Sequence, residues 1–98
     1  MKDIKWITNE EDPMFGKQYK SHRIVLENIE LSIYKNKGEK KLFTLQLSRI
    51  NDHVVIEHLE IETELRYAKT KLISMAVEYL SNKIKSYGKD LREIAPIL

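Results

Sequence analysis

The chain has 98 residues, of which 42% are hydrophobic and 33% charged, and its formal net charge at pH 7 is +2. A chain of this length can build one hydrophobic core but not two, so we expect a single domain spanning residues 1–98. The absence of cysteine excludes disulfides, thiolate catalysis and cysteine-based zinc sites. The small net charge is unlike the strongly basic face that is typical of nucleic-acid-binding proteins.

Targeting signals are also missing from the sequence. The longest apolar run is far shorter than the roughly 20 residues of a membrane-spanning helix, and the segment Met1 to Lys5 lacks the apolar stretch of a signal peptide. We therefore expect a cytoplasmic protein with no membrane partner.

The N-terminal region, residues 1–21, predicts one short strand and a loop. Residues 4–7 combine two isoleucines with Trp6 as an apolar anchor, which favours a strand. Residues 8–17 are dense in charge and in turn-forming side chains, so they predict a surface loop.

Residues 22–61 show the period-two alternation of apolar side chains that is typical of strands with one buried face. The alternation is clearest in two sets, Ile29, Leu31, Ile33 and Phe43, Leu45, Leu47. Turn-forming residues divide the region at Glu27-Asn28, at Asn36 to Glu39 around Gly38, and at Asn51-Asp52. The region therefore predicts a four-stranded antiparallel β-meander.

Near Thr63 the apolar period changes from two to the three-and-four spacing of an amphipathic helix. We expect a helix over residues 63–87, with Thr63 as its N-cap and Gly88 ending it, followed by a C-terminal tail over residues 88–98. The stripe expected to lie on the sheet consists of Leu65, Ala68, Leu72, Ala76 and Tyr79. A run of strands followed by one helix predicts an α+β fold in which the meander packs against one long C-terminal helix.

The expected helix carries more apolar surface than one sheet contact requires. A second stripe, formed by Ile73, Val77, Leu80 and Ile84, widens its apolar arc. Three coverings remain open. The tail with Leu91, Ile94 and Ile97 could fold back, the segment around Met14 and Phe15 could reach over, or a second chain could cover the stripe as a homodimer or a docked target.

No catalytic, cofactor or metal motif is present, so we expect a protein that is not an enzyme and needs no cofactor. The three glycines are isolated and cannot form a phosphate-binding loop. His53 and His58 differ by an odd number of positions and so point to opposite faces of a regular strand. Acid–base chemistry by Glu57 and Glu60 beside His58 would need a cleft, and salt bridging is the ordinary role of such residues.

Charged residues gather in two clusters. The acidic run Glu10, Glu11 and Asp12 precedes the apolar pair Met14 and Phe15. A basic hairpin tip, next to an aromatic ring, comprises Tyr34, Lys35, Lys37, Lys40 and Lys41. Such a tip can contact nucleic-acid phosphates, although solvated loops often look the same.

The layout resembles that of small accessory proteins of phages and mobile elements, anti-CRISPR proteins among them. The resemblance lies in an early Trp6, a meander of short strands, and the segment Glu64 to Lys69 leading a helix that contains Ala76. It implies a protein that inhibits a host defence nuclease by occupying its surface, in the host cytoplasm if a phage encodes it.

Together these observations predict a non-enzymatic protein-binding module. In this hypothesis the carboxylates of Glu10, Glu11 and Asp12 imitate phosphates, Met14 and Phe15 act as apolar anchors, and the extra helix stripe contributes Ile73, Val77 and Ile84 as a dimer or partner surface. The alternative is a small nucleic-acid-binding protein that uses the tip from Lys35 to Lys41.

Overall fold

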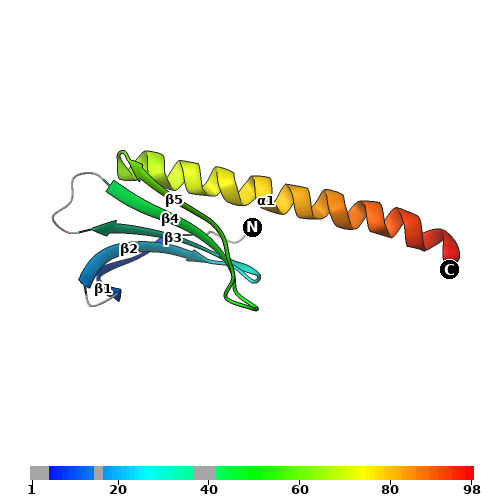
Figure 1. Cartoon of the computed structure of the whole chain (residues 1–98), viewed down its shortest axis with the longest axis horizontal. Coiled ribbons are helices and arrows are strands. Elements are labelled where there is room, and N and C mark those ends of the chain that lie inside the picture. Colours follow the sequence, from blue (N-terminus) through cyan, green and yellow to red (C-terminus); the bar gives the residue numbers. More distant parts are fainter. Residues whose placement is uncertain (1–4, 15–16, 37–41) are drawn as a thin grey trace.

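A computed structural model of the chain describes residues 5–14, 17–36 and 42–98. Its elements, in chain order, are β1 (Ile7–Met14), β2 (Lys17–Val25), β3 (Ile29–Asn36), β4 (Leu42–Arg49), β5 (Val55–Glu62), α1 (Leu65–Ile94) and a 3-10 turn η1 (Ala95–Ile97). The strands form one antiparallel sheet in the order β1-β2-β3-β4-β5, and α1 lies on one of its faces (Figure 1). An antiparallel sheet with one long C-terminal helix confirms the predicted α+β fold.

The core lies between α1 and the central strands β3 and β4. Strand pairing sets Ile33 opposite Leu45 and Leu31 opposite Leu47 on one face, because side chains two apart on a strand share a face. Leu72 enters this layer from the helix and is fully buried. The remaining core side chains are Ile24, Ile29, Phe43, Ala68, Met75 and Ala76.

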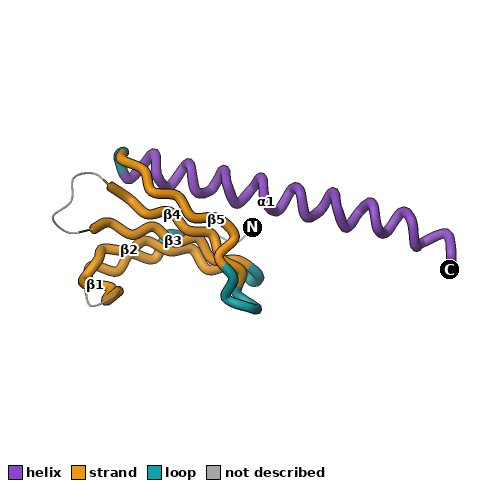
Figure 2. Tube along the Cα trace, viewed as in Figure 1, coloured by secondary structure: helices purple, strands orange, loops and turns teal. Residues whose placement is uncertain are grey.

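The helix is much longer than the sheet that it covers. Strands of eight or nine residues span about 30 Å, whereas a helix of 30 residues spans about 45 Å. Its buried residues, Ala68, Leu72, Met75 and Ala76, all lie in its N-terminal half. The C-terminal half therefore projects past the sheet, as the tube in Figure 2 shows, and the molecule measures 59 × 27 × 24 Å.

The prediction of a loop over residues 8–17 was wrong, and the sheet has five strands where four were expected in the meander. Residues 7–14 form β1, whose backbone pairs with β2 from Ile7 opposite Arg23 to Met14 opposite Lys17. The pairing register shifts at a bulge between Asn9 and Asp12. Strand β1 lies at the edge of the sheet, and edge strands tolerate charge and proline better than central strands do. Backbone pairing with a neighbouring strand thus prevails over poor strand propensity. Trp6, the expected anchor, precedes β1 and packs against the core.

Both predicted helix ends were also wrong. Glu64, and not Thr63, is the N-cap, and the helix continues through Gly88 to Ile94. A helix-interior glycine costs only about 1 kcal/mol relative to alanine, which good helix formers on both sides offset. The α-helix ends instead just before Pro96, which has no backbone N–H to donate to the carbonyl of Arg92, and the chain continues as the 3-10 turn η1.

Replacing Gly88 by alanine is expected to stabilise the projecting half of α1. A Cβ added at this position meets no heavy atom within 4 Å, so the substitution introduces no clash. We expect Gly88→Ala to raise the free energy of unfolding by up to about 1 kcal/mol, with a gain in helical circular dichroism. An unchanged or lower helical signal would show that the helix ends near residue 88 in solution.

Candidate interaction surface on the projecting helix

An uninterrupted apolar stripe follows α1 on the side that the sheet leaves open. We call it the seam, and it consists of Ile73, Val77, Leu80, Ile84, Tyr87, Leu91 and Ile94. Each of these side chains is between 37% and 73% exposed. None of the described helix residues after Ala76 is buried, so the seam emerges from the sheet-covered half and continues along the projecting half.

The spacing of the seam is that of a coiled coil. Its intervals alternate strictly between four and three residues, an average of 3.5 per turn, which keeps the stripe facing one partner helix as the two supercoil. In heptad notation the a positions are Val77, Ile84 and Leu91, and the d positions are Ile73, Leu80, Tyr87 and Ile94. Leu98, fully exposed beyond the 3-10 turn, follows at the next interval.

The C-terminal tail does not cover the second stripe, contrary to one of the three predicted coverings. Leu91 and Ile94 belong to the same straight helix and extend the stripe, while Ile97 beyond them is 81% exposed. A segment that continues a helix cannot fold back onto it. Met14 ends β1 at one edge of the sheet, whereas α1 packs on β3 and β4. Phe15 lies outside the described residues.

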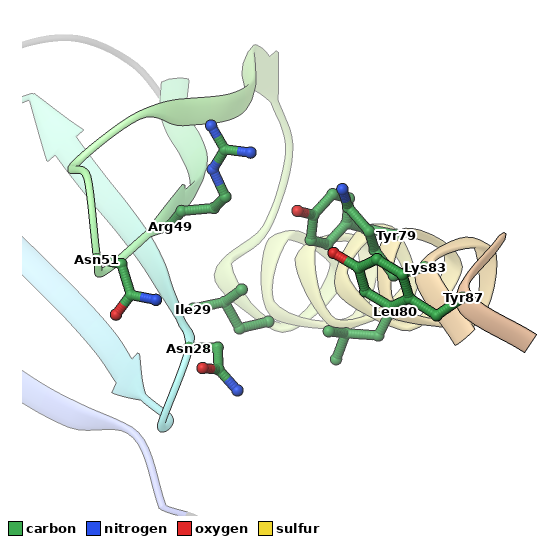
Figure 3. Close-up of a pocket in the computed structure, with 8 residues that line it drawn as sticks. All are labelled: Asn28, Ile29, Arg49, Asn51, Tyr79, Leu80, Lys83 and Tyr87. Atoms are coloured by element: carbon green, nitrogen blue, oxygen red, sulfur yellow. The ribbon is translucent and has the colours of Figure 1, made fainter. Parts of the chain in front are cut away.

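A shallow cavity of about 330 Å³ lies beside the seam, where α1 leaves the sheet (Figure 3). Its lining comprises Asn28, Ile29, Arg49, Asn51, Tyr79, Leu80, Lys83 and Tyr87. These residues come from the loop between β2 and β3 with the start of β3, from the end of β4 with the turn after it, and from one face of the helix. The lining contains no carboxylate, imidazole or thiol that could serve as a general base.

Two cationic side chains, Lys83 and Arg49, line the cavity. The Lys83 ammonium lies 5.7 Å from the ring centroid of Tyr79 and 5.8 Å from that of Tyr87, within cation–π range of both. The Arg49 guanidinium donates hydrogen bonds of 2.9 and 3.2 Å to the carboxylate of Asp52. Lys83 is thus positioned at the margin of the seam, where it can meet an acidic group on a partner.

The acidic run predicted to bind a partner lies on an edge of the sheet. Glu10, Glu11 and Asp12 belong to β1, with the bulge between Asn9 and Asp12 among them. Charged residues and bulges on an edge strand prevent pairing with another sheet, which is a sufficient structural reason for their presence.

The predicted nucleic-acid tip is not assembled on one surface by the described residues. Tyr34 and Lys35 are consecutive in β3, so their side chains point to opposite faces of the sheet. Lys35 places its ammonium 6.0 Å from the ring centroid of Phe43, on the face that α1 covers. Lys37, Lys40 and Lys41 lie outside the described residues.

Two of the three histidines have ordinary structural partners. His22 is buried, with Nδ1 3.0 Å from the Thr8 hydroxyl, and His58 contacts the side chains of Gln46 and Glu60. Across residues 5–14, 17–36 and 42–98, no group of three His, Cys, Asp or Glu side chains could hold a metal ion. Within the same ranges no helix is both long and apolar enough to cross a membrane.

No protein-family model, curated protein or solved structure matches this chain. Its candidate surface is therefore defined by its own geometry. Sequence reasoning found Ile73, Val77 and Ile84 but did not join Tyr87, Leu91 and Ile94 to them. The signal that would have joined them is the four-and-three spacing, which continues past Gly88. Gly88 was instead interpreted as the end of the helix.

The two faces of α1 are expected to respond differently to truncation. Leu72→Ala removes a fully buried side chain and should lower the free energy of unfolding by about 2–5 kcal/mol. Leu91→Ala changes a side chain that is 64% exposed and should alter it by less than about 0.5 kcal/mol in dilute protein. Denaturant titration at low protein concentration measures both changes in the free energy of unfolding. Equal losses of stability in the two variants would contradict the assignment of the two faces.

Proposed function

We propose that this protein is a non-enzymatic protein-binding module whose binding surface is the seam of α1. The observation that supports the proposal is the seam itself, seven large apolar side chains at coiled-coil spacing, all exposed. Monomeric proteins rarely expose contiguous apolar patches beyond a few hundred Å² unless the patch is an interaction site.

The projecting half of the helix also needs a partner for its own stability. An isolated helix shorter than about 12–15 residues is marginal in water, and helices in proteins are held mainly by packing on an apolar face. The sheet supplies such packing only as far as Tyr79, the last helix residue that contacts the core. A partner along the seam would supply it for the remainder.

Helix recognition is the mode of binding that this geometry favours. An amphipathic helix is bound either in an apolar groove or against another helix, through anchors at three-and-four spacing. The sheet acts as the base that holds α1 in place, through Ala68, Leu72, Met75 and Ala76. No reacting group is required in this role, since shape and apolar complementarity supply the affinity.

Site-specific photo-crosslinking tests the proposal in cells. A crosslinking residue in place of Ile84, on the seam, should yield adducts with protein, whereas the same residue in place of Lys89, on the opposite side of the helix, should not. The mass of each adduct separates a second copy of this chain from an unrelated partner. Absence of adducts from position 84, or equal yields at both positions, would refute the proposal.

Inhibition of a host defence nuclease stays a narrower proposal for the same module. It assigns phosphate mimicry to Glu10, Glu11 and Asp12, and reversing these three charges should then abolish inhibition while leaving seam-dependent binding intact. A nuclease assay that compares the charge-reversed variant with the wild-type chain measures this. Unchanged inhibition after charge reversal would remove the mimicry hypothesis.

A further inference from the structure

We propose that the partner of the seam is a second copy of this chain, bound antiparallel through α1. This inference rests on the proposed function and names the occupant of the same surface. In the register proposed, Ile84 packs against the partner's Tyr87, and the two-fold axis passes between Lys85 and Ser86 of both helices. The two sheets then lie at opposite ends of the helix pair.

The antiparallel register pairs the seam residues from Val77 to Ile94. In antiparallel coiled coils the a position of one helix meets the d position of the other. With Ile84 against the partner's Tyr87, the same offset places Leu80 against the partner's Leu91. It also sets Val77 against the partner's Ile94. Symmetry repeats each pair, so the six seam residues from Val77 to Ile94 are all paired, while Ile73 lies level with the segment that follows the partner's helix.

Charge at the flanking g positions selects this register. The exposed or half-exposed charges at g are Lys83 and Asp90, and antiparallel helices bring g opposite g. The proposed register sets Lys83 against the partner's Asp90, twice across the interface. A shift of one heptad in one direction opposes Lys83 to the partner's Lys83, and a shift in the other opposes Asp90 to the partner's Asp90. Both shifts replace two attractions with a repulsion.

The other flank of the seam carries small residues at the e positions, Ser74, Ser81 and Gly88. Antiparallel pairing sets Ser81 against the partner's Gly88, where small side chains let the helices approach at the short end of the usual 8–10 Å. Parallel pairing would instead set Lys83 against the partner's Gly88 and leave both charges unpaired. The distribution of charge and size therefore favours the antiparallel dimer.

The cavity beside the seam lies next to this charge pair. Lys83 lines the cavity, so in the proposed register the partner's Asp90 approaches the rim of the cavity at Lys83. Ile73 and Val77, in the sheet-covered half of α1, are 42% and 58% exposed, so the sheet does not cover their open side.

The area reaches the lower limit for a specific interface. A large apolar side chain carries on the order of 100 Å² of surface that burial removes from water. Both seams with their flanks then bury on the order of 1,000 Å², the size at which a specific interface becomes plausible.

Oligomeric mass gives the first test. Sedimentation equilibrium of the full chain should return twice the chain mass of 11.6 kDa, and Leu80→Glu with Leu91→Glu should return the monomer. A wild-type chain that is monomeric at its highest soluble concentration overturns the dimer. If the chain is monomeric but position 84 still crosslinks to other proteins, the proposed protein-binding function stands and only the dimer is overturned.

Charge reversal tests the register. Lys83→Asp alone should oppose two acidic groups twice across the dimer, and Asp90→Lys alone two lysines, so each should weaken self-association about tenfold at low salt. Mixed together, the two variants pair opposite charges at both sites and should form a heterodimer close to wild-type affinity. The double variant Lys83→Asp/Asp90→Lys should likewise restore the homodimer.

Lys89→Asp is the matched control, because it makes the same charge change at an f position on the outer side of the helix. It should leave the dimer unchanged, and circular dichroism at protein concentrations where each variant is dimeric should show equal helicity for all of them. A dimer that does not respond to Lys83→Asp or Asp90→Lys, or a mixture that does not form the heterodimer, overturns the antiparallel register.

Discussion

The structure depends on a mismatch of length between its helix and its sheet. Eight or nine residues give each strand about 30 Å, while the 30 residues of α1 extend about 45 Å. The buried residues of α1, which run from Ala68 to Ala76, lie in its first half, against β3 and β4. The elongated shape of the molecule and the exposure of the seam beyond Tyr79 follow from this difference in length.

The mismatch divides α1 into two surfaces with different energetics. The sheet-facing side uses small or medium residues, with Ala68 and Leu72 fully buried, and it holds the domain together. The seam side chains do not belong to the core, so they contribute less to the stability of the monomer than the sheet-facing side chains do. Their further contribution becomes available only on association, when water leaves the surface. Stability and binding thus reside on separate faces of one element.

Local chemistry supports this division. Lys83 lies between the rings of Tyr79 and Tyr87, which fixes a cation at the margin of the seam, while Arg49 is held by Asp52. At the other end of the sheet, β1 closes the edge with a bulge and a run of acidic residues, which discourages association by strand pairing. Both features favour the helix over the sheet edge as the surface for association.

The sequence by itself determined the α+β class, the hairpin turn at Glu27-Asn28, the core alternation and the surplus of apolar residues on the helix. These follow from side-chain periodicity, which is local and can be read along the chain. It did not reveal that residues 8–14 pair as a strand or that the helix runs through Gly88 to Ile94. Strand pairing depends on a neighbour distant in sequence, and one glycine decides a helix end only when its context is otherwise balanced. Only the tertiary structure, by setting a long helix on a short sheet, decided that the second apolar stripe stays uncovered.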